Sequence, residues 1–347
     1  MKAVYSPRHA AHEPRVELAY GAAEPAHEIP ARAEAIRSAL ESDGGFEWLE
    51  LREHGREPIE AVHDPALVRY VERAWTEWQA ALGSEGEAIP WTFGLAGLRE
   101  GMEPFEPSRT TLELGSWCFD TGNPLTAGAA DAARTSVDVA LTAADAILGG
   151  ERAAYGLCRP PGHHAARAVF GGYCFFNNAA IATRHLLDGG STRVAVLDVD
   201  YHHGNGTQQL FYRRGEVLTV SVHADPAREF PYFTGFADEI GAGAGRGTNV
   251  NLPLPAAVDD DAFLAAVGQG LETVAGFGAD TLVVPLGVDT FRGDPLGDFD
   301  VGGEAYPRLG RLLAGAGLPT LVLQEGGYAV SELGANVLGV LRALDGR

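Results

Sequence analysis

Lysine is almost absent from this chain of 347 residues: Lys2 is the only one, and arginine supplies every other strongly basic side chain. Lysine and arginine together number 26 against 47 aspartates and glutamates, which gives a formal net charge of -21. Phosphate binding requires a basic stripe, so this composition argues against a nucleic-acid partner. Solubility accounts for most of the charge, but an acidic surface also raises the local concentration of cations, which suits a cationic substrate.

Long apolar segments are also missing. No run approaches the roughly 18 apolar residues of a membrane-spanning helix, and the N-terminal MKAVYSPRHA has no hydrophobic signal region. Cysteine is scarce, since Cys118, Cys158 and Cys174 are the only three, and their spacing is not that of a metal site. An odd count in a long chain is typical of a reducing compartment. We therefore expect a cytoplasmic protein with no membrane partner.

The sequence predicts one α/β domain that spans residues 1–347. With 46% hydrophobic residues the chain can bury a large core. Strands alternate with helices from residue 153 to the C-terminus, which is the pattern of a multi-stranded parallel sheet with helices on both faces. No linker and no internal repeat divides the chain. The expected strands are 2–5, 155–158, 194–198, 217–222, 281–288 and 320–323.

The expected helices are 31–40, 64–82, 126–148 with Thr126 as N-cap, one that ends near 189, 259–277, 304–314 and 331–344. Two long stretches have no clear period. Residues 6–30 read as a polar loop, and residues 83–125 are rich in glycine, proline and aromatic side chains. Long irregular segments in compact domains are often functional. We expect residues 83–125 to form an inserted segment that restricts the site or makes a contact between two copies of the chain.

The stretch 194–207, VAVLDVDYHHGNGT, is the most informative in the chain. Its apolar start predicts a strand that is buried on both faces. Asp198, Asp200 and His202 then alternate along the chain, so their side chains point to the same side. Because an unpaired buried carboxylate is very costly, two of them indicate a cation or strong donors nearby. Asp200 and His202 are therefore predicted to bind a divalent metal ion.

Asp289 supplies a third candidate ligand. It follows the predicted strand 281–288, and the carboxyl ends of parallel strands meet at one edge of a sheet. Three protein ligands leave a position open for water and substrate, which is typical of a catalytic zinc site. Fe²⁺ or Mn²⁺ uses similar ligands, but the usual affinity order favours zinc over both.

Two further motifs carry groups suited to acid–base chemistry. His163 and His164 follow a rigid Pro-Pro-Gly turn, and histidine titrates near neutrality, as a general base or acid requires. Tyr328 ends the motif EGGY, where its phenol is able to stabilise a developing oxyanion. Taken alone, the histidine pair is equally typical of a surface loop, and Tyr328 of a packed aromatic side chain.

Five motifs in this order make the chain similar to the zinc-dependent deacetylases of the arginase/deacetylase fold, also known as the histone deacetylase family. They are RPPGHHA (159–165), GGYCFFNNAA (171–180), LDVDYHHGNGTQQLFY (197–212), LGVDTF (286–291) and EGGY (325–328). The N-terminal YSPRHA and VELAYG extend the resemblance, over essentially the whole chain, to the bacterial acetylpolyamine amidohydrolases.

The resemblance implies a role for each candidate in the site. Zinc, with Fe²⁺ as an alternative, would be held by the three ligands predicted above. The tandem histidines would transfer protons, with His164 as the general base and later the acid, and Tyr328 would polarise the acetyl carbonyl. Asp198 would orient His163, and Asn205 would orient His164. The family also implies a structural K⁺ ion, whose ligands here would be the side chains of Asp198 and Ser221 and the carbonyls of Asp200, His202 and Val222.

The resemblance also implies how the substrate is held. Tyr173 and Phe230 would line a narrow acyl tunnel, Gly172 would let the substrate pass close to the backbone, and Leu296 would occupy a position that is acidic in some polyamine-selective relatives. The VELAYG match makes Glu17 and Tyr20 further candidates for substrate binding. The segment 83–125 would pack across a homodimer, where Glu113 or Asp120 is the nearest acid to meet a distal ammonium.

From these residues we expect a hydrolase of linear amide bonds that deacetylates acetylpolyamines of the acetylputrescine or acetylcadaverine type. Three alternatives stay open. A protein acetyl-lysine deacetylase would have a more open mouth, and a catalytically silent acetyl-ligand binding protein would not need the complete set of ligands, histidines and tyrosine. A binuclear manganese ureohydrolase would need more ligands at the strand ends.

Overall fold

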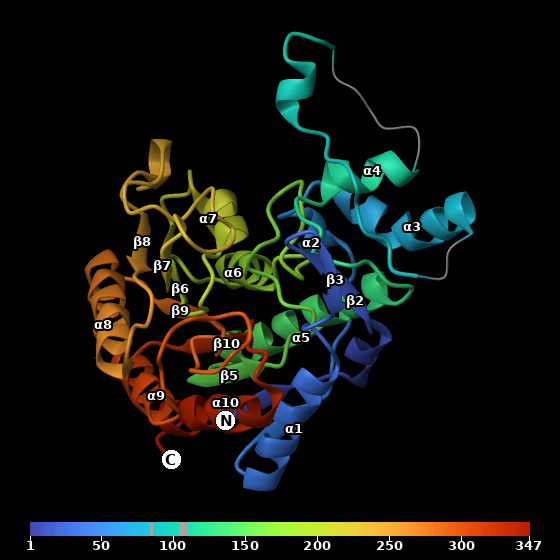
Figure 1. Cartoon of the computed structure of the whole chain (residues 1–347). Helices are drawn as coiled ribbons and strands as arrows, with labels where there is room; N and C mark the ends of the chain where they lie inside the picture. Colours follow the sequence, from blue (N-terminus) through green and yellow to red (C-terminus); the bar gives the residue numbers. More distant parts are fainter. Residues whose placement is uncertain (84–85, 104–109) are drawn as a thin grey trace.

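The computed structural model of the chain describes residues 1–83, 86–103 and 110–347, and its centre is an eight-stranded sheet in which every pairing is parallel (Figure 1). This arrangement confirms the predicted α/β fold. In spatial order the strands are β4 (Glu47–Leu49), β1 (Lys2–Val4), β5 (Ala153–Gly156), β10 (Thr320–Gln324), β9 (Thr281–Leu286), β6 (Val194–Asp198), β7 (Val217–Ala224) and β8 (Asn249–Leu254).

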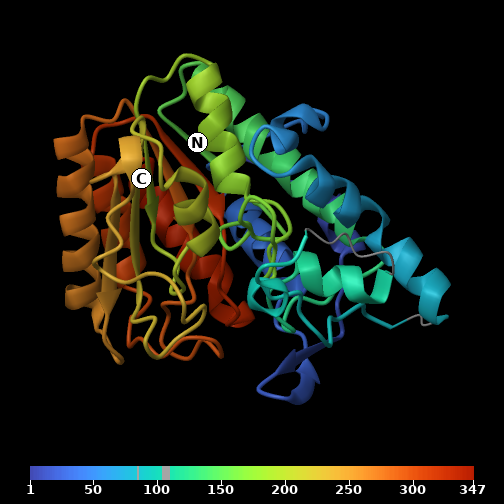
Figure 2. The ribbon, with the colours of Figure 1, turned by 90° about the horizontal axis from the view of Figure 1, so that it is seen from above.

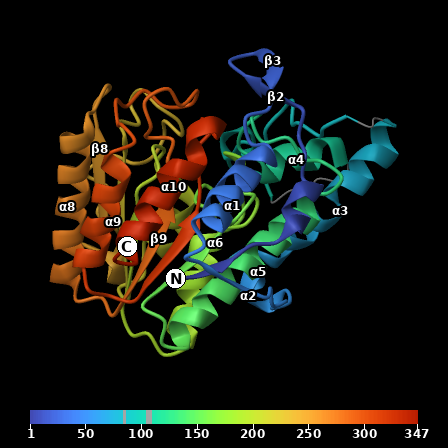
Figure 3. The same cartoon turned by 90° about the horizontal axis from the view of Figure 1, so that it is seen from below.

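Helices cover both faces of the sheet, as predicted (Figures 2 and 3). Alternate residues of β6 separate the two layers: Val194 and Val196 belong to one apolar cluster, whereas Ala195 and Leu197 belong to the other. The first cluster contains α3 (Pro65–Leu82), α5 (Ala129–Leu148) and α6 (Asn178–Asp188). The second contains α1 (Ala31–Asp43), α8 (Asp260–Phe277), α9 (Ala305–Gly315) and α10 (Val330–Leu344).

Several short elements were not predicted. The expected loop 6–30 contains a 3-10 helix, η1 (Pro7–Ala11), and an antiparallel hairpin of β2 (Val16–Ala19) and β3 (Ala22–Pro25). The strands β4 and β8 were also missed. Both lie at the ends of the sheet, where β8 tolerates Pro253 because an edge strand need not donate every backbone hydrogen bond. The remaining missed elements are α2 (Glu57–Glu60), η2 (Ala96–Arg99), α4 (Thr110–Trp117), α7 (Asn205–Phe211) and η3 (Gly243–Gly245).

Two boundaries depend on capping residues. The Asp64 side chain accepts a hydrogen bond from the Ala66 amide and begins α3 close to the predicted residue. The prediction that Thr126 caps the next long helix is wrong. Its hydroxyl lies 2.9 Å from His12 Nδ1, and α5 begins after Gly128 without a side-chain cap.

The neighbouring strands β10, β9 and β6 place the predicted site residues together. Because these strands are parallel, their carboxyl ends share one edge of the sheet, where ligands of open α/β sheets bind. Asp200 and His202 follow β6, Asp289 follows β9, and Tyr328 follows β10. Among the described helices, none has both the length and the apolarity to cross a lipid bilayer.

Candidate metal centre and active site

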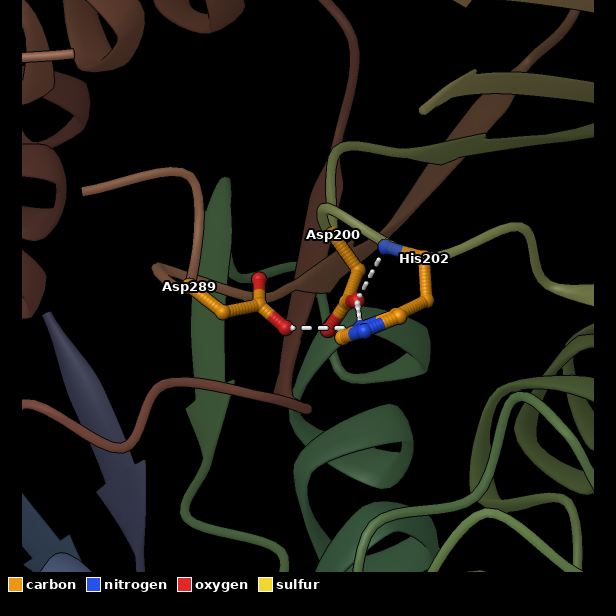
Figure 4. Close-up of side chains that lie close together, drawn as sticks. All are labelled: Asp200, His202 and Asp289. Carbon is orange, nitrogen blue, oxygen red and sulfur yellow. Dashed lines mark hydrogen bonds and ion pairs between the residues drawn. The ribbon is translucent and has the colours of Figure 1, made fainter. Parts of the chain in front are cut away.

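Asp200, His202 and Asp289 converge on one point, as Figure 4 shows. His202 Nδ1 lies 3.3 Å from Asp200 Oδ1 and 3.1 Å from Asp289 Oδ2. One ligand atom from each residue lies within 4.8 Å of the others, and both carboxylates are buried. The three residues that the sequence predicts as ligands are therefore close enough to hold a single ion.

The charges of this cluster fit a divalent cation. Burial, followed by the charge of Asp200, raises the pKa of Asp289 to about 7. Burial lowers the pKa of His202, but its hydrogen bonds to the two carboxylates outweigh that effect and raise the pKa to about 10. Within the triad, the His202 imidazole is the only group that is able to carry a positive charge, and it faces two buried carboxylates. A metal ion would compensate both negative charges and leave the imidazole neutral.

Glycines make room for the carboxylates. A Cβ atom on Gly326 would lie 2.6 Å from Asp200 Oδ2 and would overlap Asp289 Oδ2, while one on Gly287 would overlap Asp200 Oδ2. The Gly326 amide donates a 2.8 Å hydrogen bond to the same Asp200 oxygen. The second residue of the EGGY motif thus lets the backbone approach and orient a predicted ligand.

The tandem histidines lie beside this centre in different surroundings. His163 Nδ1 donates to Asp198 Oδ2 across 3.0 Å, and His164 Nδ1 lies 2.6 Å from Asn205 Oδ1. The Asn205 amide nitrogen donates to the His164 carbonyl, which fixes its oxygen as the acceptor. His164 Nδ1 therefore carries the proton, and Nε2 is left as the acceptor. Both partners, Asp198 and Asn205, are those expected from the sequence.

The same surroundings separate the pKa values of the two histidines. Burial opposes a charge on His163, but the neighbouring carboxylates of Asp200 and Asp198 outweigh it and raise its pKa well above the usual range. For His164, burial and then the charges of His163 and His202 lower the pKa well below it. Since opposite shifts in a pair indicate different roles, His163 is suited to be the imidazolium and His164 the neutral base.

Two buried carboxylates were missed by the sequence reasoning, one beside His163 and one beside Tyr328. Glu325 accepts hydrogen bonds from the Gly162 amide at 2.7 Å and the His163 amide at 3.2 Å, and burial raises its pKa to about 7. Asp294 accepts from the Tyr328 amide at 2.6 Å. The only sequence signal was the place of each acid, one at the start of EGGY and one five residues after Asp289.

Tyr328 is buried next to the predicted tunnel. Its ring packs edge-on against Tyr173 with 5.6 Å between centroids, and the Arg32 guanidinium lies 4.6 Å from its centroid. Arg32 also donates to the carbonyls of Glu325 and Gly327 on either side of the turn. These contacts fix the position of the aromatic ring. The role of Tyr328 in polarising the acetyl carbonyl stays a prediction.

Aromatic side chains lie over the tandem histidines. The Phe230 ring is 5.0 Å from that of His164, and Phe119, which was not predicted, stacks on Phe230 at 5.8 Å. Gly172 has a φ of 56°, and a Cβ there would overlap the His164 ring. Tyr173 also has a positive φ, 64°, and its hydroxyl donates a 2.8 Å hydrogen bond to Glu17. The left-handed backbone at two successive residues is typical of a functional site.

The predicted specificity residues fall into two groups. Glu17 is buried and Asp120 is half-buried near Gly172 and Tyr173. Asp120 Oδ2 accepts a hydrogen bond from the Gly172 amide at 2.5 Å, while the buried Asp120 Oδ1 has no hydrogen bond within the described part of the chain. Burial raises the pKa of Asp120 to about 6. Glu113, in contrast, forms an ion pair with Arg73 on α3. Of the two acids considered in the segment 83–125, Asp120 is therefore the better placed.

The other two predicted substrate contacts lie further out. Tyr20 is at the exposed tip of the β2–β3 hairpin, with its hydroxyl 3.2 Å from that of Tyr232. Leu296 is half-buried and its amide donates to Asp294. In the interactions described above, neither Tyr20 nor Leu296 contacts the triad.

The side chains predicted to bind K⁺ are neighbours in the sheet. Asp198 and Ser221 are register partners on β6 and β7, and both line a small cavity of about 10 Å³. Ser221 Oγ also lies 2.8 Å from His223 Nδ1. Val222, the remaining predicted carbonyl ligand, follows on β7.

Residues 26–344 match the model of the histone deacetylase domain, which is most of the chain. The chain belongs to the histone deacetylase family. Members of this family are metal-dependent deacetylases, and this chain is accordingly a hydrolase of the amidohydrolase type. The cluster of Asp200, His202 and Asp289 is the candidate for the metal site that such an enzyme requires.

Named relatives match this histone deacetylase family member over its full length. It is 45% identical to acetylpolyamine amidohydrolase 1 of Pseudomonas aeruginosa, with 100% of the chain and 99% of the relative covered. It is 42% identical to the acetylpolyamine amidohydrolase of Mycoplana ramosa, with both chains covered completely. The crystal structure of acetylpolyamine aminohydrolase from Burkholderia pseudomallei superposes with a TM-score of 0.94 at 39% identity and covers 99% of this chain and 98% of its own.

Proposed function

We propose that the protein removes the acetyl group from acetylated linear polyamines, with release of acetate and the free amine. The observation that carries this proposal is the position of Glu17 and Asp120. The buried Glu17 and the half-buried Asp120 accept hydrogen bonds from the Tyr173 hydroxyl and the Gly172 amide, beside the backbone that packs against His164. A second ammonium group on the substrate would compensate their charge. The names of the full-length relatives support the same substrate class.

Zn²⁺ is the ion that we propose for Asp200, His202 and Asp289, because one imidazole and two carboxylates suit it and affinity favours it over Fe²⁺. When bound, such an ion lowers the pKa of a water molecule and polarises the acetyl carbonyl. We also propose a structural K⁺ ion at Asp198 and Ser221, which the adjacent cavity supports.

The side chains divide the proton transfers. His164 accepts the proton of the attacking water through Nε2, since Nδ1 is held by Asn205. His163, charged and bound to Asp198, stabilises the negative charge that builds up on the reacting group. Tyr328 donates its hydroxyl proton in a hydrogen bond to the former carbonyl oxygen. His164 then returns the proton to the departing amine nitrogen, so the amine leaves as a neutral group.

The tunnel selects a slender chain. Phe119, Phe230 and Tyr173 would contact the methylene groups of an acetylated diamine, and Gly172 would let them pass along the backbone. Glu17 and Asp120 would then receive the distal ammonium, as a carboxylate in a buried site favours a paired cation. We infer a cytoplasmic homodimer in which the segment 83–125 narrows the entrance.

A turnover panel with the zinc-loaded enzyme tests this function. The panel contains acetylated diamines, acetylspermidine, acetylspermine and a folded protein that carries acetyl-lysine. We expect the highest kcat/KM for an acetylated diamine. If the folded protein is the better substrate, the polyamine assignment fails, although deacetylation itself would stand.

A variant of Glu17 makes the panel specific. Glu17→Gln should lower kcat/KM for an acetylated diamine by about 10-fold or more, which corresponds to the loss of one charged hydrogen bond. It should change kcat/KM much less for an N-alkylacetamide of the same length without the ammonium. Glu151→Gln, which removes an exposed carboxylate from the loop after α5, is the matched control.

A further inference from the structure

Asp294 is a buried acid to which the proposed mechanism gives no role. It lies in the turn after β9, five residues beyond the predicted ligand Asp289, where its own amide donates to the Phe291 carbonyl across 2.9 Å. Its side chain is only 5% exposed. A buried carboxylate is very costly unless donors surround it, so the partners of Asp294 indicate what the residue serves.

The Asp294 carboxylate joins two segments of the proposed active site. Oδ1 accepts a 3.0 Å hydrogen bond from the Leu296 amide in the same turn. Oδ2 accepts from the amides of Tyr328 at 2.6 Å and Ala329 at 3.0 Å, which lie between β10 and α10. All three donors belong to the main chain. Asp294 therefore ties the backbone after one ligand strand to the backbone that carries the Tyr328 phenol.

The turn that contains Tyr328 depends on partners from outside it. Gly327 has a φ of 122°, which favours glycine, and Ala329 precedes α10 without a side-chain cap. On one side of the turn, Arg32 donates a hydrogen bond to the Gly327 carbonyl. Asp294 accepts from the two amides that follow. A guanidinium thus holds an acceptor of this turn, and a carboxylate holds its donors.

The position of the Tyr328 backbone decides where its hydroxyl lies. The Arg32 guanidinium lies 4.6 Å from the ring centroid over one face, and the Tyr173 ring packs edge-on with 5.6 Å between centroids. These contacts orient the ring. The reach of the hydroxyl follows from the Cα atom, which the hydrogen bond from the Tyr328 amide to Asp294 anchors. A displacement of about 1 Å in a reacting group costs about 10²-fold in rate.

We propose that Asp294 is a positioning residue for the hydrolysis. Through the amides of Tyr328 and Ala329, it places the phenol hydroxyl beside the acetyl oxygen. This role rests on the proposed function, in which Tyr328 donates to that oxygen. Asp294 does not take part in the chemistry itself, because both of its oxygens already accept backbone hydrogen bonds.

A double-mutant cycle between Asp294 and Tyr328 tests the proposal. Asparagine offers one acceptor oxygen where aspartate offers two, so Asp294→Asn loses its hold on one of the two segments. We expect kcat for an acetylated diamine to fall by about 10- to 100-fold with little change in KM. In the Tyr328→Phe background the same substitution should change kcat by less than about 2-fold, because the hydroxyl that Asp294 positions is already gone. Independent losses that multiply in the double variant would overturn the proposal.

Asp280→Asn is the matched control for this cycle. Asp280 Oδ2 also accepts from two successive amides of another segment, those of Thr192 and Arg193 at 2.7 and 3.2 Å, but the residue precedes β9 at the opposite edge of the sheet. The control variant should keep the wild-type kcat. A fall as large as that of Asp294→Asn would mean that the loss of any such anchor impairs the enzyme, and the assignment would be wrong.

Two further measurements separate position from charge. After burial and the charge of Asp200, the charge of Asp294 also raises the pKa of Asp289, so each variant is loaded with zinc and its bound metal is measured. Asp294→Glu keeps the charge but moves the carboxylate by one methylene group, and it should show the same loss of kcat and the same cycle. Full activity of Asp294→Glu, or loss of metal from Asp294→Asn, would place the role of Asp294 in its charge and overturn the proposal.

Crystal structures of the wild type and of both Asp294 variants give a readout that does not depend on turnover. We expect the Tyr328 hydroxyl to shift by about 1 Å or more, with Asp200, His202 and Asp289 unmoved. A Tyr328 that keeps its wild-type position in both variants would contradict the proposal. If the wild type hydrolyses no acetylated amine, the proposed function fails, whereas these structures still decide whether Asp294 places Tyr328.

Discussion

At the scale of single residues, Tyr328 and Arg32 show how one side chain is positioned for a predicted role. The guanidinium lies 4.6 Å from the phenol ring centroid and donates to the carbonyls of the turn, so the ring is packed through its face. The hydroxyl itself has no hydrogen bond to another described residue. A group that is fixed by its ring and free at its hydroxyl fits a donor to a developing oxyanion.

Tyr328→Phe removes only that hydroxyl. We expect kcat to fall by about 10²- to 10³-fold with a small change in KM, because the hydrogen bond strengthens in the transition state. Steady-state kinetics with an acetylated diamine and metal analysis of the same preparation measure the effect. A variant that keeps its metal and near-normal kcat would show that Tyr328 serves only packing.

Asp120 links stability to pH. Burial raises its pKa from 3.8 to about 6, so between these values the folded protein holds a proton that the unfolded chain has lost. Stability should therefore decrease as the pH rises through this window. Relative to Asp120→Asn, the wild type should lose about 2 kcal/mol in the free energy of unfolding between pH 4 and pH 6.

Urea titrations of the wild type and Asp120→Asn at several pH values measure this difference, and the contributions of all other groups cancel to a first approximation. A pH-independent difference would mean that Asp120 is already ionised in the folded protein. In that case a permanent partner, rather than a substrate ammonium, would compensate its charge.

At the scale of elements, the turn between β10 and α10 packs closely against two of the predicted metal ligands. Gly326→Ala would push a Cβ atom into Asp289 and to 2.6 Å from Asp200 Oδ2. We expect metal affinity to fall by about 10- to 100-fold, as for other losses of support around ligands. Titration of the metal-free protein with Zn²⁺ measures it.

Gly268→Ala on α8 is the control for this variant, since a Cβ there meets nothing within 4 Å. It should keep the wild-type metal affinity and raise stability by about 0.5–1 kcal/mol, because alanine is the better helix residue. Equal metal affinities in all three proteins would contradict the assignment of the ligands.

The elements also show why some parts of the site could be predicted. Strands with strong apolar patterns lead directly into Asp200, His202 and Asp289. Because the carboxyl ends of parallel strands meet at one edge of the sheet, the convergence of these residues could be predicted. Glu325 directly follows β10, so the same rule could have placed it at this edge. Phe119 could not be placed in this way, because its partner, the Phe230 ring, is 111 positions away in the chain and no local pattern encodes such a contact.

The same reasoning applies to the missed elements of the fold. In β8, Asn249 and Asn251 weaken the strand pattern because their side chains serve a buried network with Gln208. In the β2–β3 hairpin, the polar Glu17 is buried, where it accepts hydrogen bonds from the Tyr173 hydroxyl and the His27 amide. In both cases tertiary contacts outweigh the local propensity of the residues.

At the scale of the whole molecule, the segment 83–125 exposes large apolar side chains. Trp91, Leu95, Leu98 and Met102 are 82%, 65%, 68% and 62% exposed. Apolar side chains gathered on one segment are typical of a contact surface. The predicted homodimer would cover them, and the described part of the segment leads directly into Phe119 and Asp120 at the tunnel.

Leu95→Glu/Leu98→Glu should therefore yield monomers, because burying two carboxylates in an apolar contact is very costly. Sedimentation velocity measures the oligomeric state. Since the dimer is expected to narrow the entrance, the monomer should also lose part of its preference for acetylated diamines over acetyl-lysine peptides. The control Leu148→Glu/Ile240→Glu places the same charges at apolar positions outside the segment, both 38% exposed, and should remain dimeric.

The two readouts together decide what the segment does. A monomeric variant with unchanged preference would mean that the entrance is complete within one chain, where Glu17 and Asp120 already lie beside Tyr173. A variant that stays dimeric would place the contact elsewhere on the surface. Only the joint loss of the dimer and of the preference for acetylated diamines supports the inference that a second copy helps to select the substrate. Added salt should weaken that selection further, because it screens the attraction between the substrate ammonium and the acidic chain.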